Sequence, residues 1–366
     1  MPSPSSDRPI AFVLPDMRYG GAERVALRLI RSLVERGYPV ELVLMEKHGE
    51  LLEHLPPEVR LIDLGANRIR SAMMPLIRYL KERRPRTIQV RMWPLTVIAI
   101  VAAKLARVTT RVVISDHVDL SQQYGGSWRT LAAVRSTIRL IYPLAYARIC
   151  VSEGVAADLS RLSGLRRSAF DVIYNPIEPP SKIETTAEVE RAWAGGRGKR
   201  ILAVGSLKEQ KNHRLLIDAF ARLSDPTARL MIVGEGPLRR VLEQQAATMG
   251  VSDRVVMPGL GNPWPYYASA NLFVLSSDYE GLGNVIIEAM YARLPVVSTN
   301  CPSGPAEILA DGKFGRLVPV GDAGRLCAAI KAALSETSDR GVLTARAAEL
   351  SGAAALNAYE RLLRHP

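Results

Sequence analysis

Cysteine is scarce in this chain, and its pattern excludes a disulfide framework. The 366 residues include only Cys150, Cys301 and Cys327, an odd number with no paired spacing. Small secreted domains that depend on disulfides carry even numbers of cysteines at close spacings. We therefore expect a protein of a reducing compartment, the cytoplasm.

Long hydrophobic runs are also missing. The longest, around residues 96–103, is far shorter than the roughly 20 residues that a transmembrane helix needs, so we expect no membrane-spanning segment. The apolar stretch near the N-terminus is short and has no cleavage-like site, so we expect no signal peptide. Aromatic residues make up only 6% of the chain and no reading motif occurs, which argues against a nucleic-acid partner.

The charge is strongly one-sided in one part of the chain. Residues 60–148 contain sixteen Lys or Arg against four Asp or Glu, and this excess equals the net charge of +12 of the whole chain. A segment of this kind suggests an anionic partner, either nucleic acid or an anionic membrane face. The 48% hydrophobic content and the length indicate a globular protein of two domains.

Strand-like runs alternate with amphipathic helical patterns, which predicts parallel α/β layers. In the first half we expect strands at 10–14, 40–45, 87–91, 111–115, 147–151 and 171–174, with a helix at 22–35. In the second half we expect strands at 200–204, 229–233, 254–257 and 316–318, and helices at 212–223, 237–249 and from about 322. A glycine-containing loop between the first strand and the first helix is typical of a doubly wound sheet.

The domain boundaries follow from composition. Residues 179–199 are rich in proline, glycine and polar side chains, which predicts a linker. We expect an N-terminal Rossmann-like domain over residues 1–178 and a C-terminal Rossmann-like domain over residues 200–340. A last helix over 341–366 is expected to pack back on the first domain.

The segment EGLGNVIIEAM, residues 280–290, carries the most chemistry. Glu280 follows an apolar strand and so lies at its carboxyl end, where open α/β sheets bind ligands. Glu288 falls about one turn into the next helix, whose first N–H groups lack intrahelical partners and suit a phosphate. The residues that supply these N–H groups are Leu282, Gly283, Asn284 and Val285. Carboxylates beside such a site accept hydrogen bonds from sugar hydroxyls, although a turn glutamate and a solvated helix glutamate are the plainer alternative.

Two tandem α/β domains with a glycine loop in the first and Glu-x7-Glu in the second resemble a GT-B glycosyltransferase. More closely, the chain resembles glycosyltransferase family 4, the retaining enzymes that use nucleotide sugars. The motifs that carry the resemblance are GGAERV (20–25), SDH (115–117), VIYNPI (172–177), VGSLKEQKN (204–212), VGEGP (233–237) and EGLGNVIIEAM (280–290). It covers nearly the whole chain and implies two Rossmann-like domains that face each other across a cleft, the first for the acceptor and the second for the nucleotide sugar.

The resemblance also implies roles for single residues. Glu280 would contact sugar hydroxyls near the reacting carbon, and Glu288 would bind the ribose. Lys211 would pair with the diphosphate and stabilise the leaving group, whereas otherwise it is an exposed lysine at a helix start. His117 would contact the transferred sugar, whereas a lone histidine after a strand is more often an ordinary polar residue. The remaining donor-binding residues implied in the two glycine loops are Gly20, Gly21, Gly205 and Ser206.

The chain departs from the family at one position. Many relatives have an arginine after the glycine of the 205 loop, as a second diphosphate clamp, and this chain has Ser206. Lys208 or the Ser206 hydroxyl is expected to substitute, although an ammonium does not form the bidentate fork of a guanidinium.

No Asp-x-Asp triplet and no His/Cys cluster with metal-ligand spacing occurs in the sequence. Metal-dependent sugar transferases use such carboxylates to hold a cation on the diphosphate. We therefore expect no metal and no cofactor, with Lys211 and helix N–H groups in that role. No nucleophile with a paired base is evident. The resemblance implies retention by same-face attack with the leaving phosphate as the proton acceptor, which we adopt as a hypothesis.

Two basic segments, residues 68–86 and 128–148, combine arginines with helical apolar stripes. In the second, Leu131, Val134 and Ile138 share one face with Ile141 and Ala145, and the arginines lie on the other side. Basic helices with an apolar face suit anionic bilayers, whereas amphipathic helices more often pack their apolar face inward. We predict a cytoplasmic protein that is peripheral at the inner face of the cytoplasmic membrane.

Together these features predict a hexosyltransferase of cell-surface polysaccharide or glycoconjugate synthesis. It would move a hexose or N-acetylhexosamine from a nucleotide sugar, with UDP favoured by the resemblance, to a lipid-linked saccharide or other glycan. The alternatives are the same fold with GDP-mannose, or a nucleotide-sugar-binding protein without catalysis. A Rossmann oxidoreductase is disfavoured, because neither glycine loop contains the full Gly-x-Gly-x-x-Gly pattern.

Overall fold

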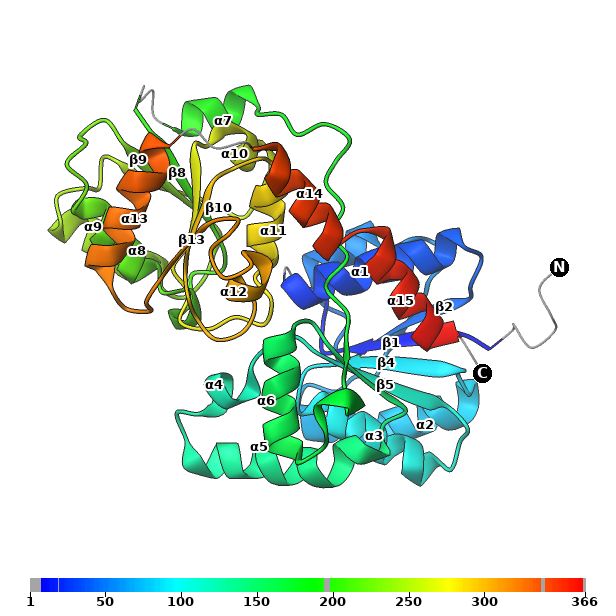
Figure 1. Cartoon of the computed structure of the whole chain (residues 1–366). Helices are drawn as coiled ribbons and strands as arrows, with labels where there is room; N and C mark the ends of the chain where they lie inside the picture. The colour runs from blue at the N-terminus through cyan, green and yellow to red at the C-terminus, as the bar shows by residue number, and fades with distance from the viewer. Residues whose placement is uncertain (1–7, 19, 194–197, 337–339, 365–366) are drawn as a thin grey trace. The chain divides into compact units, whose positions relative to one another are not determined.

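The computed structural model describes residues 8–18, 20–193, 198–336 and 340–364 (Figure 1). The chain divides into two compact units. The first unit runs to Pro176 and resumes at Gly352, and the second runs from Ile177 to Ser351.

The first unit is built on a seven-stranded parallel sheet in the order β3-β2-β1-β4-β5-β6-β7. Its strands are β1 (Ile10–Leu14), β2 (Val40–Leu44), β3 (Arg60–Asp63), β4 (Thr87–Arg91), β5 (Arg111–Asp116), β6 (Ala147–Cys150) and β7 (Asp171–Val172). Its helices are α1 (Gly21–Glu35), α2 (Met73–Arg83), α3 (Leu95–Ala106), α4 (Leu120–Tyr124), α5 (Trp128–Ile141), α6 (Glu153–Ser163) and α15 (Ala353–Arg364), with short 3-10 helices η2 (Glu50–His54), η3 (Ile69–Ala72), η4 (Tyr142–Leu144) and η5 (Arg167–Ala169).

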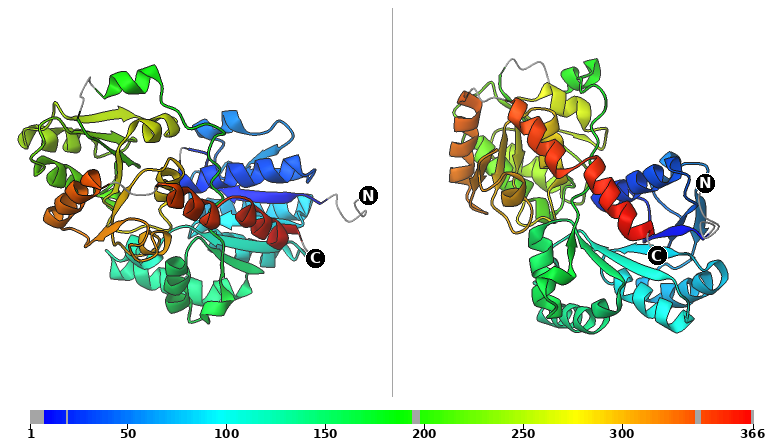
Figure 2. Two further views of the ribbon diagram at one scale, coloured as in Figure 1. Left: turned by 45° about the horizontal axis from the view of Figure 1, so that its top comes forward. Right: turned by 45° about the vertical axis from the view of Figure 1, so that its right-hand side comes forward.

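Buried apolar strands explain this sheet. Every residue of β1 and β2 is buried, as expected for parallel strands that are covered on both faces. Ile10, Phe12 and Leu14 point to the face that α1 and α15 cover, where Leu356, Tyr359 and Leu363 of α15 complete the core. The views in Figure 2 show red α15 beside blue α1. The last helix is therefore part of the first unit.

The second unit has a six-stranded parallel sheet in the order β10-β9-β8-β11-β12-β13. Its strands are β8 (Arg200–Val204), β9 (Arg229–Val233), β10 (Val255–Gly259), β11 (Leu272–Leu275), β12 (Val296–Thr299) and β13 (Arg316–Val318). Its helices are α7 (Ala187–Ala192), α8 (His213–Ala221), α9 (Arg239–Thr248), α10 (Trp264–Ser269), α11 (Asn284–Tyr291), α12 (Pro305–Ile308), α13 (Ala323–Ser335) and α14 (Gly341–Leu350), with the 3-10 helix η6 (Glu209–Lys211).

In both sheets the order in which successive strands are added reverses at one point, the topological switch point. In each, the first strand in sequence lies next to the fourth, so the order is that of the doubly wound nucleotide-binding fold. The crevice at such a switch point, outside the carboxyl ends of the two strands, is where ligands bind in open α/β sheets. The switch points here lie between β1 and β4 and between β8 and β11.

Two sequence-based expectations about segments differ from the structure. The predicted linker, residues 179–199, contains α7, and Trp193 after this helix is fully buried with its Nε1–H donated to Ser269 Oγ at 2.8 Å. The predicted single C-terminal helix is two helices, α14 and α15. The break occurs because Gly352 has φ +83° and the buried Ser351 hydroxyl bonds back to Ala347 O at 2.8 Å.

Candidate active site

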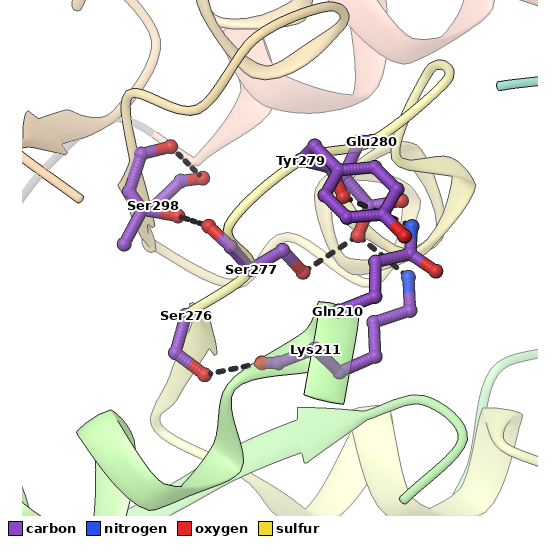
Figure 3. Close-up of polar contacts among 8 residues, drawn as sticks. Gln210, Lys211, Ser276, Ser277, Tyr279, Glu280 and Ser298 are labelled. Atoms are coloured by element: carbon purple, nitrogen blue, oxygen red, sulfur yellow. Dashed lines mark hydrogen bonds and ion pairs between the residues drawn. The ribbon is translucent and has the colours of Figure 1, made fainter. Parts of the chain in front are cut away.

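Side-chain contacts connect the loop after β8 with the loop after β11, at the switch point of the second unit. Lys211 Nζ donates to Glu280 Oε1 at 2.5 Å, and Ser277 Oγ donates to the same oxygen at 2.6 Å (Figure 3). The side chains of Lys211 and Glu280 are 15% and 7% exposed. This is a largely buried cation–carboxylate pair that reaches the surface through its lysine.

Backbone contacts hold these two loops in register (Figure 3). Gln210 Nε2 donates to Tyr279 O at 2.9 Å, and Ser276 Oγ donates to Lys211 O at 2.9 Å. The Asp278 N–H donates to Gln210 O at 2.9 Å. Because each loop fixes the backbone of the other, the Lys211 ammonium is held at a defined position beside the carboxylate.

The start of α11 has the geometry of an anion site. Gly283 is its N-cap residue with φ +91°, a conformation that side chains with a Cβ rarely adopt. No side chain of the described residues caps this eight-residue helix, the Ile286 N–H donates to Gly283 O at 2.9 Å, and the helix dipole favours negative charge at this end. Glu288, one turn further on, is 3% exposed and accepts a hydrogen bond from Tyr267 Oη at 3.0 Å.

The glycine loop after β8 is packed tightly against its neighbours. A Cβ on Gly205 would lie 3.4 Å from the Lys211 side-chain carbons, and one on Gly234 would lie 2.0 Å from Gly205 O. Close approach of two loop backbones therefore requires glycine at 234. Ser206 is half-buried in this loop, and the exposed Lys208 donates its N–H to Ser206 O at 2.9 Å.

The first unit carries the other predicted residues. Gly20 is the N-cap residue of α1 and Gly21 its first residue. A Cβ on Gly20 would lie 2.0 Å from Glu23 Oε2, so the Glu23 carboxylate folds back over the start of its own helix. Burial raises the pKa of Glu23, and the Arg91 cation opposes this rise.

His117 follows β5 and lies 3.0 Å, through Nε2, from Ser115 Oγ. Burial lowers the pKa of His117 well below its usual range, and the nearby Arg91 cation lowers it further. Its imidazole is therefore neutral at physiological pH. A neutral ring can accept or donate a hydrogen bond to a sugar hydroxyl.

The structure brings Lys211, Glu280 and Gly205 into contact within the second unit. The residues of the 282–285 segment and Glu288 form the first turns of α11 beside them. Gly20, Gly21 and His117 occupy the corresponding ends of β1 and β5 in the first unit. Among the described residues, no three His, Cys, Asp or Glu side chains gather as a metal site would require.

Two residues near His117 were not predicted from the sequence. Arg91, the last residue of β4, is fully buried, and Asp116 is 1% exposed with its Oδ1 accepting from Tyr142 Oη at 3.1 Å. Burial raises the pKa of Asp116 to about 7. Their positions at the ends of predicted strands could have indicated both residues. The arginine did not stand out, because the sequence around it contains many other basic residues.

The predicted apolar face of residues 128–148 lies in the core rather than at the surface. Val134 and Ile138 of α5 and Ala145 after it are buried, because this side of the helix packs on the first unit. The opposite side of α5 exposes Trp128 and Leu140, which are 76% and 70% exposed. Within the described residues, no helix combines the length and apolar character needed to cross a bilayer.

Comparison with known proteins identifies relatives of both halves. The profile of the family described as "Glycosyltransferase Family 4" matches residues 19–180, and that of "Glycosyl transferases group 1" matches residues 198–336. The chain is 31% identical over 228 residues to the Campylobacter jejuni N-acetylgalactosamine-N,N'-diacetylbacillosaminyl-diphospho-undecaprenol 4-alpha-N-acetylgalactosaminyltransferase. That match covers 62% of this chain and spans about three fifths, 61%, of the relative's length.

A second relative is matched over more of its length. The amylovoran biosynthesis glycosyltransferase AmsD of Erwinia amylovora is 28% identical over 298 residues, which cover 81% of each chain. Among solved structures, Anabaena HepE in complex with UDP and glucose superposes with a TM-score of 0.80 at 21% identity, over 97% of this chain and 98% of that chain. This similarity shows that the two proteins share the GT-B fold.

Proposed function

Since the chain belongs to glycosyltransferase family 4 of the group 1 glycosyltransferases, we propose that it is a retaining hexosyl- or N-acetylhexosaminyltransferase of cell-surface glycan synthesis. The proposed donor is a UDP-sugar and the proposed acceptor a lipid-linked saccharide. The observation that carries this proposal is the Lys211–Glu280 pair at the switch point of the second unit, beside the start of α11.

The residues of the second unit are assigned to the donor. The Lys211 ammonium and the first N–H groups of α11 bind the diphosphate. Gly205 and Ser206, in the loop that follows β8, contact the donor as well. Glu288 accepts hydrogen bonds from the ribose hydroxyls, and Glu280 accepts them from the transferred sugar. Lys211 therefore leaves Glu280 for the diphosphate, or bridges both, when the donor binds.

The reaction exchanges one bond at the anomeric carbon for another. The bond from that carbon to the diphosphate oxygen breaks, and a bond to the acceptor oxygen forms on the same face of the sugar. The acceptor proton passes to the leaving phosphate oxygen. Lys211 and the N–H groups of α11 stabilise the negative charge that develops on the diphosphate, which is the role that a metal cation has in other sugar transferases. His117, neutral because of its burial, contacts the transferred sugar.

The donor and acceptor classes draw support from the named relatives. Anabaena HepE was solved in complex with UDP and glucose, and the name of the Campylobacter relative includes a diphospho-undecaprenol saccharide. A GDP-mannose donor is the alternative, because no described side chain is assigned to the base. A non-catalytic nucleotide-sugar-binding protein would share the second-unit site but show no transfer.

We further propose that the exposed side of α5 docks on an anionic membrane surface. Trp128, Arg135 and Arg139 lie on one side of this helix, and no acidic residue interrupts it. The exposed Leu144 and Tyr146 follow directly in the chain. Arginines bind anionic headgroups with roughly 1 kcal/mol each, and Trp and Leu side chains insert at the headgroup boundary.

The neighbouring helices add to this surface. α2, α3 and α5 pack side by side in the first unit (Figure 1), and Met74 of α2 and Leu105 of α3 are 70% and 59% exposed. This combination of exposed apolar side chains with arginines differs from the buried stripe that the sequence suggested. Docking here would bring a cytoplasmic enzyme to a lipid-linked acceptor.

A transfer assay tests the proposed function. The protein would be incubated with UDP-glucose, UDP-galactose, UDP-N-acetylglucosamine, UDP-N-acetylgalactosamine or GDP-mannose and with a polyprenyl-diphosphate-linked disaccharide, and the product mass and anomeric coupling constant measured. We expect one UDP-sugar to be transferred with the anomeric configuration of the donor retained. Transfer with inverted configuration, or from GDP-mannose alone, would contradict the proposal, and donor binding without any transfer would favour the non-catalytic alternative.

A further inference from the structure

The switch point of the first unit contains a buried arginine that the proposed mechanism does not use. Arg91 is the last residue of β4, next to β1 in the sheet, and its relative exposure is 0%. A guanidinium without water is costly unless specific partners hold it. The groups that contact the Arg91 guanidinium therefore indicate the role of this residue.

Arg91 reaches the start of α1. Its Nη1 donates to Ala22 O at 2.6 Å, and its Nε donates to Gln89 Oε1 at 3.2 Å. The Nη2 group has no hydrogen-bond partner among the described residues. The guanidinium thus fixes the first turn of the helix that begins at the Gly20–Gly21 loop.

The same side chain lies beside the residue that holds His117. Arg91 is paired with Ser115 in the register of β4 and β5, so their side chains point to the same face of the sheet. Ser115 Oγ is the hydrogen-bond partner of His117 Nε2. On this face α15 supplies the buried Tyr359, whose pKa burial raises while the Arg91 cation and the Ser115 hydroxyl oppose the rise.

We propose that Arg91 is a positioning residue that fixes the Gly20–Gly21 loop and the His117 segment relative to each other. This inference rests on the proposed function only for its catalytic consequence. The physical basis is that one guanidinium bonds the first turn of α1 and lies in register beside the serine that orients the imidazole. The site geometry of the first unit is thereby defined by a side chain that touches no substrate.

The titratable groups around Arg91 belong to three segments of the first unit. Glu23 of α1 and Tyr359 of α15 face its guanidinium, and His117 after β5 is disfavoured in its charged form by the same cation. Loss of the Arg91 charge therefore makes protonation of His117 easier, with its burial unchanged. This electrostatic effect distinguishes Arg91 from an arginine with a purely structural role.

Two measurements that do not require catalysis test the proposal. The first is the NMR titration of His117 in histidine-labelled full-length protein, assigned with the His117→Gln variant. In Arg91→Met, His117 should titrate at a higher pH than in the wild type, whereas Arg91→Lys should titrate as the wild type does. The control is Arg148→Met, because Arg148 of β6 also bonds backbone carbonyls but is paired with Ile114 and lies on the opposite face of the sheet. An unchanged His117 titration in Arg91→Met, or an equal shift in the control, would overturn the proposal.

The second measurement is amide hydrogen exchange over residues 20–25. Both Arg91→Met and Arg91→Lys should exchange faster there, since neither reproduces the Nη1 bond to Ala22 O together with the Nε bond to Gln89. If Arg91→Met does not fold, the test uses Arg91→Lys alone. Exchange rates over residues 20–25 in Arg91→Lys equal to those of the wild type would then refute the positioning role.

The same variants should also affect transfer, because a misplaced first-unit loop should lower kcat/KM on the order of 100-fold. Absence of transfer in the wild type would count against the proposed function and not against this inference.

Discussion

Donor binding depends on the Lys211 ammonium in the proposed mechanism, and in the structure this group is held by Glu280 Oε1. Replacing Lys211 with methionine keeps the aliphatic stem that packs on Gly205 and removes the charge. Because a charge-assisted hydrogen bond contributes about 1.5–3 kcal/mol, UDP affinity should fall roughly 10- to 100-fold in Lys211→Met, and turnover should fall by at least as much. Isothermal titration and initial rates measure the two effects.

Glu280→Gln separates binding from catalysis at the same site. The amide keeps an acceptor for Ser277 but loses the carboxylate charge, so turnover should fall while UDP affinity stays within a few-fold of wild type. Lys331→Met, an exposed charge on α13, is the matched control and should change neither quantity. UDP affinity in Lys211→Met equal to that of the control would contradict the assignment of the diphosphate to Lys211.

Asp116 predicts a specific dependence of stability on pH. Burial raises its pKa from the usual 3.8 to about 7, so the folded protein keeps a proton that the unfolded chain releases. The stability from this group is complete below about pH 4 and is lost as the pH rises through about 7. Asp116→Asn keeps the Oδ1 acceptor for Tyr142 and abolishes the titration.

Denaturant unfolding of both proteins at pH 5, 6, 7 and 8 measures this effect. The free energy of unfolding of Asp116→Asn should rise relative to that of wild type across the series, by a few kcal/mol in total. A constant difference across this range would mean that Asp116 has an ordinary pKa in the folded protein.

At the scale of elements, the site is made by the ends of strands. Lys211 follows β8 and Glu280 follows β11, the two strands that flank the switch point of the second unit. Parallel strands present the same end to the same edge, so residues 69 positions apart in sequence meet there. In the proposed mechanism the helix that begins next, α11, adds the N–H groups of its first turn and the Glu288 carboxylate.

We expect α5 to bind membranes through its exposed side. Wild-type protein should co-sediment with phosphatidylcholine vesicles that contain phosphatidylglycerol and much less with phosphatidylcholine alone. Trp128→Ser with Leu140→Ser should lower the bound fraction several-fold, and since both side chains are exposed the fold should not change. The control is Leu260→Ser, which removes a 56% exposed leucine from the second unit. Wild-type protein that stays in the supernatant with both vesicle types would refute membrane docking.

Sequence patterns predicted several elements to the residue. The predicted bounds of β1, β4, β8, β9 and β13 match the observed strands, because short apolar runs between polar residues define buried parallel strands. The break between α14 and α15 was not predicted, since alanine and leucine continue across it and only Gly352 marks it. The apolar stripe of α5 that contains Val134 and Ile138 packs inward, as amphipathic helices usually do, whereas the exposure of Trp128 and Leu140 on the same helix was not predicted.

The sequence predicted the site residues of the second unit but not the buried arginine of the first unit. The resemblance supplied Lys211 and Glu280, and the structure adds that they form an ion pair, which depends on the packing of two loops. Arg91 was not predicted because burial of one arginine among sixteen basic residues in 60–148 leaves no mark in a single sequence. Its role depends on strand register and on the start of α1, which are properties of the fold.

At the scale of the whole molecule, the chain consists of two doubly wound units of the GT-B fold. Each unit has a helix start and polar or charged side chains at the carboxyl ends of its strands. These are Lys211 and Glu280 in the second unit, and Arg91 and His117 in the first. The chain enters the second unit once and returns to the first through α15, which supplies Tyr359 to the core near Arg91 and Ser115. The residues that the proposed mechanism assigns to the nucleotide, among them Lys211, Ser206 and Glu288, belong to the second unit, and the Gly20–Gly21 loop belongs to the first.

The measurement that tests the central claim most directly is the thermal midpoint with UDP, GDP or ADP, each in EDTA and then in magnesium. A nucleotide at 100 times its dissociation constant adds ~2.7 kcal/mol of stability, which raises the midpoint measurably. We predict an increase with UDP that is the same in EDTA and magnesium and is lost in Lys211→Met. No increase with any nucleotide, or an increase that requires magnesium, would contradict a metal-independent diphosphate site at Lys211 and α11.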